Sequence, residues 1–303
     1  MKLKDYLVAV ACVVLWGLTF PVIKHMSGFV PGIFLTACRF AVIAIPVAFT
    51  AFPNMGWKRF LVYSLCFGCG QYLLSTLGIY YGLSAGIAAV IMQVQVFITI
   101  GLAYAWLHEK VGVPQVIGSI LGFAGVALLL FFNTYFSISV IGLVITFTAS
   151  CCWAAVNLIV KTSRITDFTS LVAWGALPNI PILWLMSWGF GEFDKVHLDT
   201  SQLLQLAGSV IFLGLIVTFG VSVFWNGLLK KYAAIQVAPF SLLIPVVGLV
   251  SSWLWFHDTD SKQIAPLALI FAGLALVVTA NALASRSAAA AAAAALKNAP
   301  SRA

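Results

Sequence analysis

The apolar residues of this chain come in runs of about 20, and this spacing constrains the fold more than any other feature. A helix of about 20 apolar residues crosses the ~30 Å hydrocarbon core of a bilayer. The composition agrees, because 62% of the 303 residues are hydrophobic and only 8% are charged, against roughly a quarter in a soluble domain. We therefore predict an all-α integral membrane protein in contact with the lipid bilayer.

The runs predict ten transmembrane helices, at residues 5–24, 31–52, 60–80, 84–107, 114–133, 138–160, 168–189, 203–228, 233–256 and 263–284. Basic residues then set the orientation, since Lys and Arg gather on the cytoplasmic side. With the N-terminus inside, the inner side holds Lys2, Lys4, Lys58, Arg59, Lys110, Lys161, Arg164, Lys230, Lys231 and Arg286, and the outer side only Lys24, Lys195 and Lys262. Both termini are thus predicted to be cytoplasmic.

Charge and cysteine content exclude several other classes. In a soluble protein a formal net charge of +8 would indicate nucleic-acid binding. Here it reflects the Lys and Arg residues that set the membrane topology, so we expect no nucleic-acid partner. All six cysteines lie inside apolar runs, so no disulfide framework is predicted. Cys66 and Cys69 form a CxxC without a flanking His or polar cluster. Helix packing is the favoured interpretation, and no metal or cofactor is expected.

An internal repeat is the second informative feature. The stretch WGLTFPVIK at 16–24 reappears in outline as WAAVNLIVK at 153–161, and AWLHEK and LWFHDT end the fourth and ninth spans. FAGVALLL at 123 matches FAGLALVV at 271, and Gln115 and Asn133 match Gln263 and Asn281. These ordered matches predict two five-helix halves, residues 1–134 and 135–285. The low-complexity tail 286–303 is excluded from the fold as an appended or helical extension.

An odd number of spans in each half has a topological consequence. Five crossings return the chain to the opposite side, so the second half enters the membrane upside down relative to the first. Inverted repeats of this kind are typical of secondary transporters, which alternate access about a site near the midplane.

The repeated elements resemble the ten-span drug/metabolite transporter superfamily, specifically its EamA type. The resemblance rests on WG and WA in spans one and six, CRF at 38–40, HE and HD closing spans four and nine, and VAPFSLLIPVVGLV in span nine. VIMQVQVFITIGLAYAWLHEK is similar to exporters of cysteine and O-acetylserine, although many relatives have Pro where this chain has QVQVF. The resemblance implies export of small metabolites across a bacterial inner membrane.

Helix-breaking residues are one source of contacts for a polar solute, because irregular backbone at membrane depth lines a cavity or is buried in protein. Gly17 and Pro21 in span one, LPNIP at 177–181 and the prolines at 239 and 245 are candidates. The alternative is that Pro and Gly are simply common in membrane helices.

Polar and aromatic side chains near midspan are the second source. Gln93 and Gln95 lie about 200° apart on an ideal helix, so we expect only Gln93 to line a cavity and Gln95 to contact a neighbouring helix. The alternative for any such group is a hydrogen bond between helices. With Ser222 as a further polar position, the candidate substrate-binding residues are Trp16, Thr19, Arg39, Gln71, Tyr72, Gln93, Trp153, Asn157, Asn179 and Ser241.

Arg39 is the most informative of these residues. It lies about 12 Å into span two at 1.5 Å per residue, where a charge is costly and indicates function. Its guanidinium suits the carboxylate of an amino acid. The alternative is a structural Arg that snorkels toward the outer interface or bonds backbone carbonyls. Because no Asp or Glu lies in the interior of a span, we expect facilitated diffusion or exchange, or coupling through unusual groups, rather than a carboxylate proton relay.

The remaining alternatives concern function class and partners. No HExxH, GxSxG or phosphate-binding loop supports an enzyme. Gly118 and Gly122 form a small-residue pair typical of helix packing or a homodimer face, so spans five and ten are not expected to line the path. The favoured function is a secondary exporter of small polar metabolites, chiefly amino acids of the cysteine type. The alternatives are a drug or amphiphile exporter of the same fold, and a solute channel.

Overall fold

Helices make up the regular structure of the computed structural model, which describes residues 2–108, 111–131, 138–163, 165–232, 240–241, 243–257 and 264–297. Those that correspond to the ten predicted spans are, in order, α1 (Leu3–Met26); α2 (Gly32–Ile43) with η1 (Ile45–Phe49); α3 (Trp57–Leu65), η2 (Cys66–Leu73) and α4 (Leu74–Tyr80); α5 (Ala85–Met92) and α6 (Gln95–Leu107); α7 (Val113–Phe131); α9 (Val140–Lys161); α10 (Phe168–Ala176) and α11 (Asn179–Gly189); α12 (Thr200–Val210), η4 (Ile211–Val221) and α13 (Ser222–Lys231); α15 (Leu243–Phe256); and α16 (Ile264–Lys297).

Seven of these segments are long and apolar enough to cross a membrane, and the shorter apolar helices Val113–Leu129, Leu243–Phe256 and Ile264–Ala280 supply the fifth, ninth and tenth. A further short helix, η3 (Phe193–Lys195), lies between α11 and α12. Residues 233–239, which include Pro239, lie outside the described part of the chain, as do Glu109, Asn133, Asp258 and Gln263 of the repeat.

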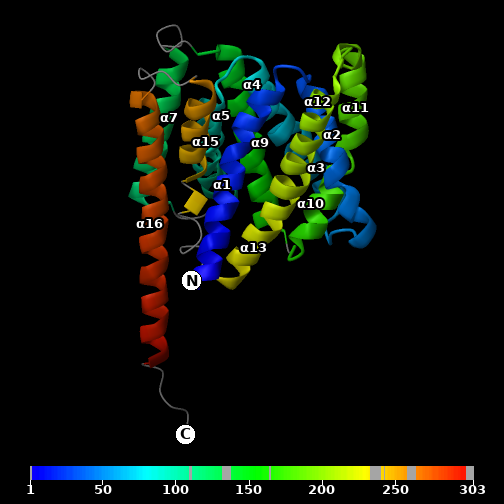
Figure 1. The fold of residues 1–303 in the computed structure, drawn as a ribbon. Helices are drawn as coiled ribbons and strands as arrows, with labels where there is room; N and C mark the ends of the chain where they lie inside the picture. The colour runs from blue at the N-terminus through cyan, green and yellow to red at the C-terminus, as the bar shows by residue number, and fades with distance from the viewer. Residues whose placement is uncertain are drawn as a thin grey trace.

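The second half of the chain enters the bundle from the end opposite to the first. The Ser139 hydroxyl at the start of α9 donates to the Tyr81 carbonyl at the end of α4, at 2.5 Å. At the other end of α9, Arg59 of α3 donates to the Thr162 carbonyl at 3.2 Å. α9 is therefore antiparallel to α3–α4 and to α1. Figure 1 shows the start of α1 and the far end of α16 at the same end of the bundle, as an even number of crossings requires.

The fifth and tenth spans pack against each other at one edge of the bundle (Figure 1). Glycine allows this close approach: a Cβ on Gly273 would lie 2.3 Å from the Gly118 carbonyl, and one on Gly125 would lie 2.5 Å from the Pro266 carbonyl. Gly122 makes room for the Phe97 ring. The small-residue pair Gly118 and Gly122 therefore serves packing within this chain, the first of the two predicted roles.

Two π-helical segments stand at matching places in the two halves. η2 lies within the third span and η4 within the eighth. A π-helix is rare and is frequent at functional sites. The repeat also appears in the backbone at His108 and His257, which end the fourth and ninth spans with φ of 51° and 50°.

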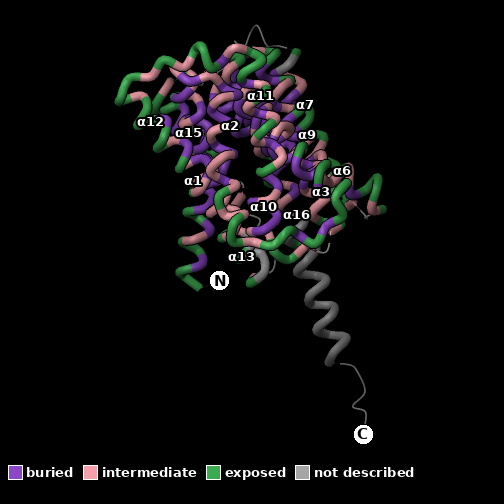
Figure 2. Tube along the Cα trace, turned by 90° about the vertical axis from the view of Figure 1, so that its right-hand side faces the viewer, coloured by how far each residue is buried: buried purple, intermediate pink, exposed green. Residues whose placement is uncertain are grey.

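The buried residues gather in the interior of the bundle, where the Cα trace in Figure 2 is mostly purple. The predicted interruption at LPNIP is present, since α10 ends at Ala176 and α11 begins at Asn179. In span one the helix is unbroken, because α1 continues through Gly17 and Pro21, which agrees with the alternative that Pro and Gly are common in membrane helices. A Cβ on Gly17 would lie 2.6 Å from the Val247 Cβ, so this glycine serves the packing of α1 against α15.

Candidate functional site

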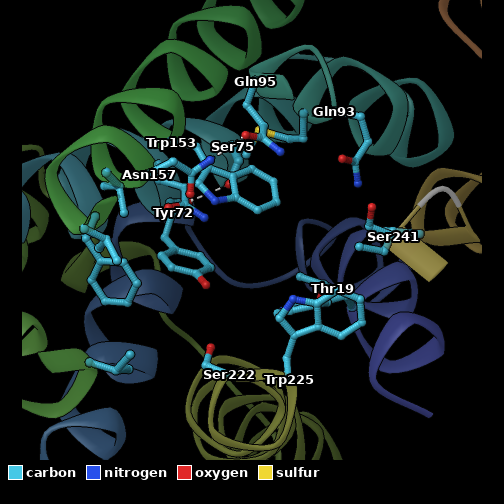
Figure 3. Close-up of a pocket in the computed structure, with 18 of the residues that line it drawn as sticks. Thr19, Tyr72, Ser75, Gln93, Gln95, Trp153, Asn157, Ser222, Trp225 and Ser241 are labelled. Atoms are coloured by element: carbon cyan, nitrogen blue, oxygen red, sulfur yellow. Dashed lines mark hydrogen bonds between the residues drawn. The ribbon is translucent and has the colours of Figure 1, made fainter. Parts of the chain in front are cut away.

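A cavity of about 540 Å³ opens among the helices near the middle of the bundle. Side chains from α1, α2, the third and fourth spans, α9, α10, α13 and α15 line it, and none of the described residues of α7 or α16 does. Figure 3 shows the labelled polar and aromatic side chains converging on one space. The cavity reaches Lys161 and Phe168, at the end of the bundle that carries the start of α1.

Most of the candidate residues meet at this cavity although they come from different spans. Those that line it are Trp16, Thr19, Arg39, Gln71, Tyr72, Gln93, Trp153, Asn157 and Ser241, together with Ser222. Candidate residues from both halves of the chain therefore lie around one cavity.

Asn179 is the exception, because it is absent from the lining and fully buried. Its Oδ1 accepts from the backbone N–H of Cys69 at 3.1 Å. Its Nδ2 lies 2.9 Å from the Ser64 carbonyl, the Ser64 hydroxyl and the Gly175 carbonyl. The side chain therefore supports the π-helical turn of η2, whose altered backbone bonding leaves groups to satisfy.

Arg39 lies in the cavity wall with only 2% of its surface exposed. Its Nε and Nη2 donate to the Thr218 hydroxyl oxygen at 3.0 and 2.6 Å. Its guanidinium carbon sits 4.2 Å from the centre of the Tyr72 ring, an arrangement in which the ring face stabilises the cation. Within the described residues no salt bridge to a carboxylate is found, so the charge is held by neutral groups.

Gln93 and Gln95 both line the cavity, which corrects the expectation that only one could. The reason is a break in the fourth span: α5 ends at Met92 and α6 begins at Gln95. Between them the backbone bonds are of the tighter i→i−3 kind, as in Val96 N–H to the Gln93 carbonyl at 3.0 Å. Ideal helical angles do not apply across such a turn.

Gln95 also makes the predicted contact between helices. Its Oε1 accepts from Asn157 Nδ2 of α9 at 2.6 Å. Gln93 differs, because its Nε2 is buried and has no hydrogen-bond partner in the described part of the chain. In Figure 3 the Gln93 and Ser241 side chains point toward each other at one side of the cavity.

Three tryptophans give the cavity its apolar walls. Trp16 and Trp225 pack edge to face with ring centres 5.3 Å apart, and Trp153 stands on the opposite helix α9. Trp225 was not predicted, although it lies one turn beyond the singled-out Ser222. Other lining residues without a sequence signal are Phe20, Tyr63, Phe67, Ser75 and Met92.

Glu192 is a further residue that the sequence did not single out. It follows α11 and is 8% exposed. Its carboxylate accepts from the backbone N–H groups of Ile33 and Phe34, at 3.3 and 2.7 Å, in the first turn of α2. A carboxylate is favourable at a helix N-terminus, so Glu192 anchors the helix that carries Arg39.

Comparison with known proteins agrees with this architecture. The sequence profile described as the EamA-like transporter family matches residues 3–131 and again residues 140–279, once in each half. The chain belongs to the EamA-like transporter family. It is a multi-pass membrane transporter with two repeats.

Two relatives carry informative names. The chain is 33% identical over 286 residues to a protein of Salmonella typhimurium named "Probable amino-acid metabolite efflux pump", covering 90% of this chain and 94% of the relative. A protein of Escherichia coli with the same name is 32% identical over the same shares. A solved crystal structure matches with a TM-score of 0.60 at 20% identity, over 91% of this chain and 98% of its own, and supports the fold.

Proposed function

We propose that this chain is a secondary carrier of a bacterial inner membrane that exports small polar metabolites, chiefly amino acids of the cysteine type. The observation that carries the proposal is Arg39, a buried cation in the wall of a midspan cavity. An intramembrane charge marks a substrate path by default, and the two relatives are named for efflux of amino-acid metabolites.

The lining suggests a role for each kind of residue. The Arg39 guanidinium is suited to a carboxylate, which it binds through two parallel donors. The amides of Gln71, Gln93 and Asn157 are placed to orient other polar groups, and the tryptophans to enclose the side chain. A largely apolar pocket with a few convergent polar groups is typical of small-molecule sites.

The proposed transport cycle starts from a state open to the cytoplasm. The cavity reaches the end of the bundle that carries the start of α1, which the distribution of basic residues assigns to the cytoplasm. Alternating access would exchange the shapes of the two halves around the midspan residues. Since no Asp or Glu lies among the described residues of the lining, we propose facilitated export or exchange.

Counterflow in proteoliposomes tests this function with labelled cysteine, O-acetylserine, threonine and an aromatic amino acid. Wild type is compared with Arg39→Gln and with Arg59→Gln, a matched control whose guanidinium bonds the Thr162 carbonyl outside the cavity. We expect saturable exchange that is lost in Arg39→Gln only. Transport of cationic amphiphiles without any amino acid would favour the drug-exporter alternative, and flux that does not saturate would favour a channel.

A further inference from the structure

The cavity carries more hydrogen-bond donors than the protein satisfies, and its fixed charge is positive. Arg39 and Lys161 are its cationic residues, and none of its described lining residues is acidic. Residues 233–239 near Ser241 contain no Asp or Glu in the sequence either. Among the described residues of the lining, a ligand that brings a fixed positive charge would meet no compensating carboxylate.

Arg39 has more N–H donors than its bonds to Thr218 use. A guanidinium has five N–H donors and accepts none. Thr218 takes one from Nε and one from Nη2. Thr218 is uncharged, so a carboxylate in the cavity would be a stronger acceptor for the same fork.

Gln93 supplies a second donor that points to a ligand. The residue is 3% exposed, and its Nε2 lacks a hydrogen-bond partner among the described residues. Buried polar groups are nearly always bonded, and an exception calls for a partner that is absent. Because the Gln93 side chain lines the cavity and points toward its Ser241 side (Figure 3), an acceptor atom of a ligand held there would supply the missing partner.

The acceptor of Gln95, another glutamine of the lining, already has a donor within the protein. Gln95 Oε1 accepts from Asn157 Nδ2 at 2.6 Å. It offers little to the ammonium group of a zwitterion, which has three donors and no acceptor. A ligand that fits this lining has a carboxylate and, in addition, an uncharged hydrogen-bond acceptor, both on an apolar body.

We propose that the preferred substrates are carboxylates whose nitrogen is uncharged or absent, such as N-acylated amino acids and 2-oxo acids, in preference to free zwitterionic amino acids. This inference rests on the proposed export function and narrows its substrate class. The carboxylate binds Arg39 in place of Thr218, the acyl or oxo oxygen accepts from Gln93, and the apolar body lies among the tryptophans.

A series with one phenyl body tests the class, because tryptophans wall the apolar part of the cavity. N-acetylphenylalanine and phenylpyruvate are anions with a second acceptor, phenylalanine is a zwitterion, and phenylalanine amide is a cation. Counterflow competition and ligand-induced shifts in melting temperature are measured for each. We expect the two anions to bind about tenfold more tightly than phenylalanine, with the amide weakest.

Gln93→Glu provides the sharper test, because it replaces the unpartnered donor with an acid. We expect it to weaken N-acetylphenylalanine by at least about tenfold and to improve phenylalanine amide. Gln93→Leu, which fills similar space without charge, should weaken the anions without helping the cation. Gln205→Glu adds the same charge outside the cavity, beside His25, and should leave the ranking unchanged.

The possible outcomes distinguish a failure of this substrate class from a failure of the proposed export function. Exchange of phenylalanine or cysteine with no preference for the anions would overturn the inference and leave amino-acid export intact. An unchanged ranking in both Gln93 variants would also overturn it. Absence of both exchange and melting shifts for every compound would overturn the proposed function as well.

Discussion

Arg39 and Asn179 reach from the second span of one half to the π-helical segment of the other. Arg39 of α2 donates to Thr218 in η4, and Asn179 at the start of α11 accepts from the Cys69 N–H in η2. A glycine allows each approach: a Cβ on Gly214 would lie 2.9 Å from the Arg39 carbonyl, and one on Gly68 would lie 2.1 Å from the Asn179 side chain. The two halves are thus joined by a pair of related contacts.

The two contacts differ in whether the side chain keeps hydrogen-bonding groups that the protein does not use. All polar atoms of the Asn179 side chain are bonded to protein, whereas Arg39 faces the cavity with donors in excess. The same place in the repeat is bonded within the protein in one half and lies at the cavity wall in the other.

The hydroxyl of Thr218 is expected to matter for stability. Thr218→Val keeps the shape but removes the acceptor of Arg39 and the donor to the Leu213 carbonyl at 2.7 Å. The free energy of unfolding should fall by about 1–3 kcal/mol, because a buried charged group loses its partner. Thr218→Ser keeps both bonds and should melt close to wild type in detergent. Equal melting temperatures for the two variants would contradict this role.

Asn179→Leu tests the assignment of Asn179 to structure rather than to substrate. We expect a loss of about 2–4 kcal/mol in unfolding free energy, because several buried backbone and hydroxyl groups lose their partners at about 1–3 kcal/mol each. The order of substrate affinities, measured on the folded fraction of the variant, should stay as in wild type. Asn157→Leu is the comparison, since Asn157 lines the cavity and should alter transport. A changed ranking in Asn179→Leu would return this residue to the binding site.

The sequence predicted the architecture because the physical signals for it are local. Apolar length places helices in a bilayer, and the repeated residues revealed the two halves. The candidate residues converged because a polar or charged group at membrane depth is costly unless it has a partner. Arg39 was singled out by that rule, and Asn157 by its polarity together with its place one turn beyond Trp153.

The same rule could not say which partner each polar group has. Asn179 is as polar and as deep as Asn157, but its partners are backbone groups exposed by a π-helical turn that no local pattern marks. Gln95 was excluded from the lining because the fourth span was treated as one ideal helix. The break after Met92 carries neither Pro nor Gly, so the sequence gives no sign of it.

Glycines at the edge pair α7–α16 are expected to be intolerant of a methyl group. In Gly273→Ala the new Cβ would lie 2.3 Å from the Gly118 carbonyl and 2.9 Å from the Gly122 nitrogen. The helices must separate, and overpacking costs about 1–3 kcal/mol. Gly101→Ala in α6 is the control, since nothing lies within 4 Å of its Cβ and alanine favours a helix by up to about 1 kcal/mol. Melting in detergent should show opposite shifts, and a stabilised Gly273→Ala would refute the packing argument.

The bond between Gln95 and Asn157 is expected to couple α6 to α9 through the cavity wall. In a double-mutant cycle of Gln95→Leu and Asn157→Leu, the coupling free energy should be about 0.6 kcal/mol and no more than about 1.7, as for hydrogen bonds between membrane helices. Gln95→Leu combined with Ser187→Ala should be additive, because Ser187 bonds Glu192 instead. The cycle is measured by unfolding in detergent. Additivity of the first pair would show that the 2.6 Å contact contributes nothing, and that the packing of α9 and the longer contact to Thr99 at 3.5 Å hold Asn157 in place.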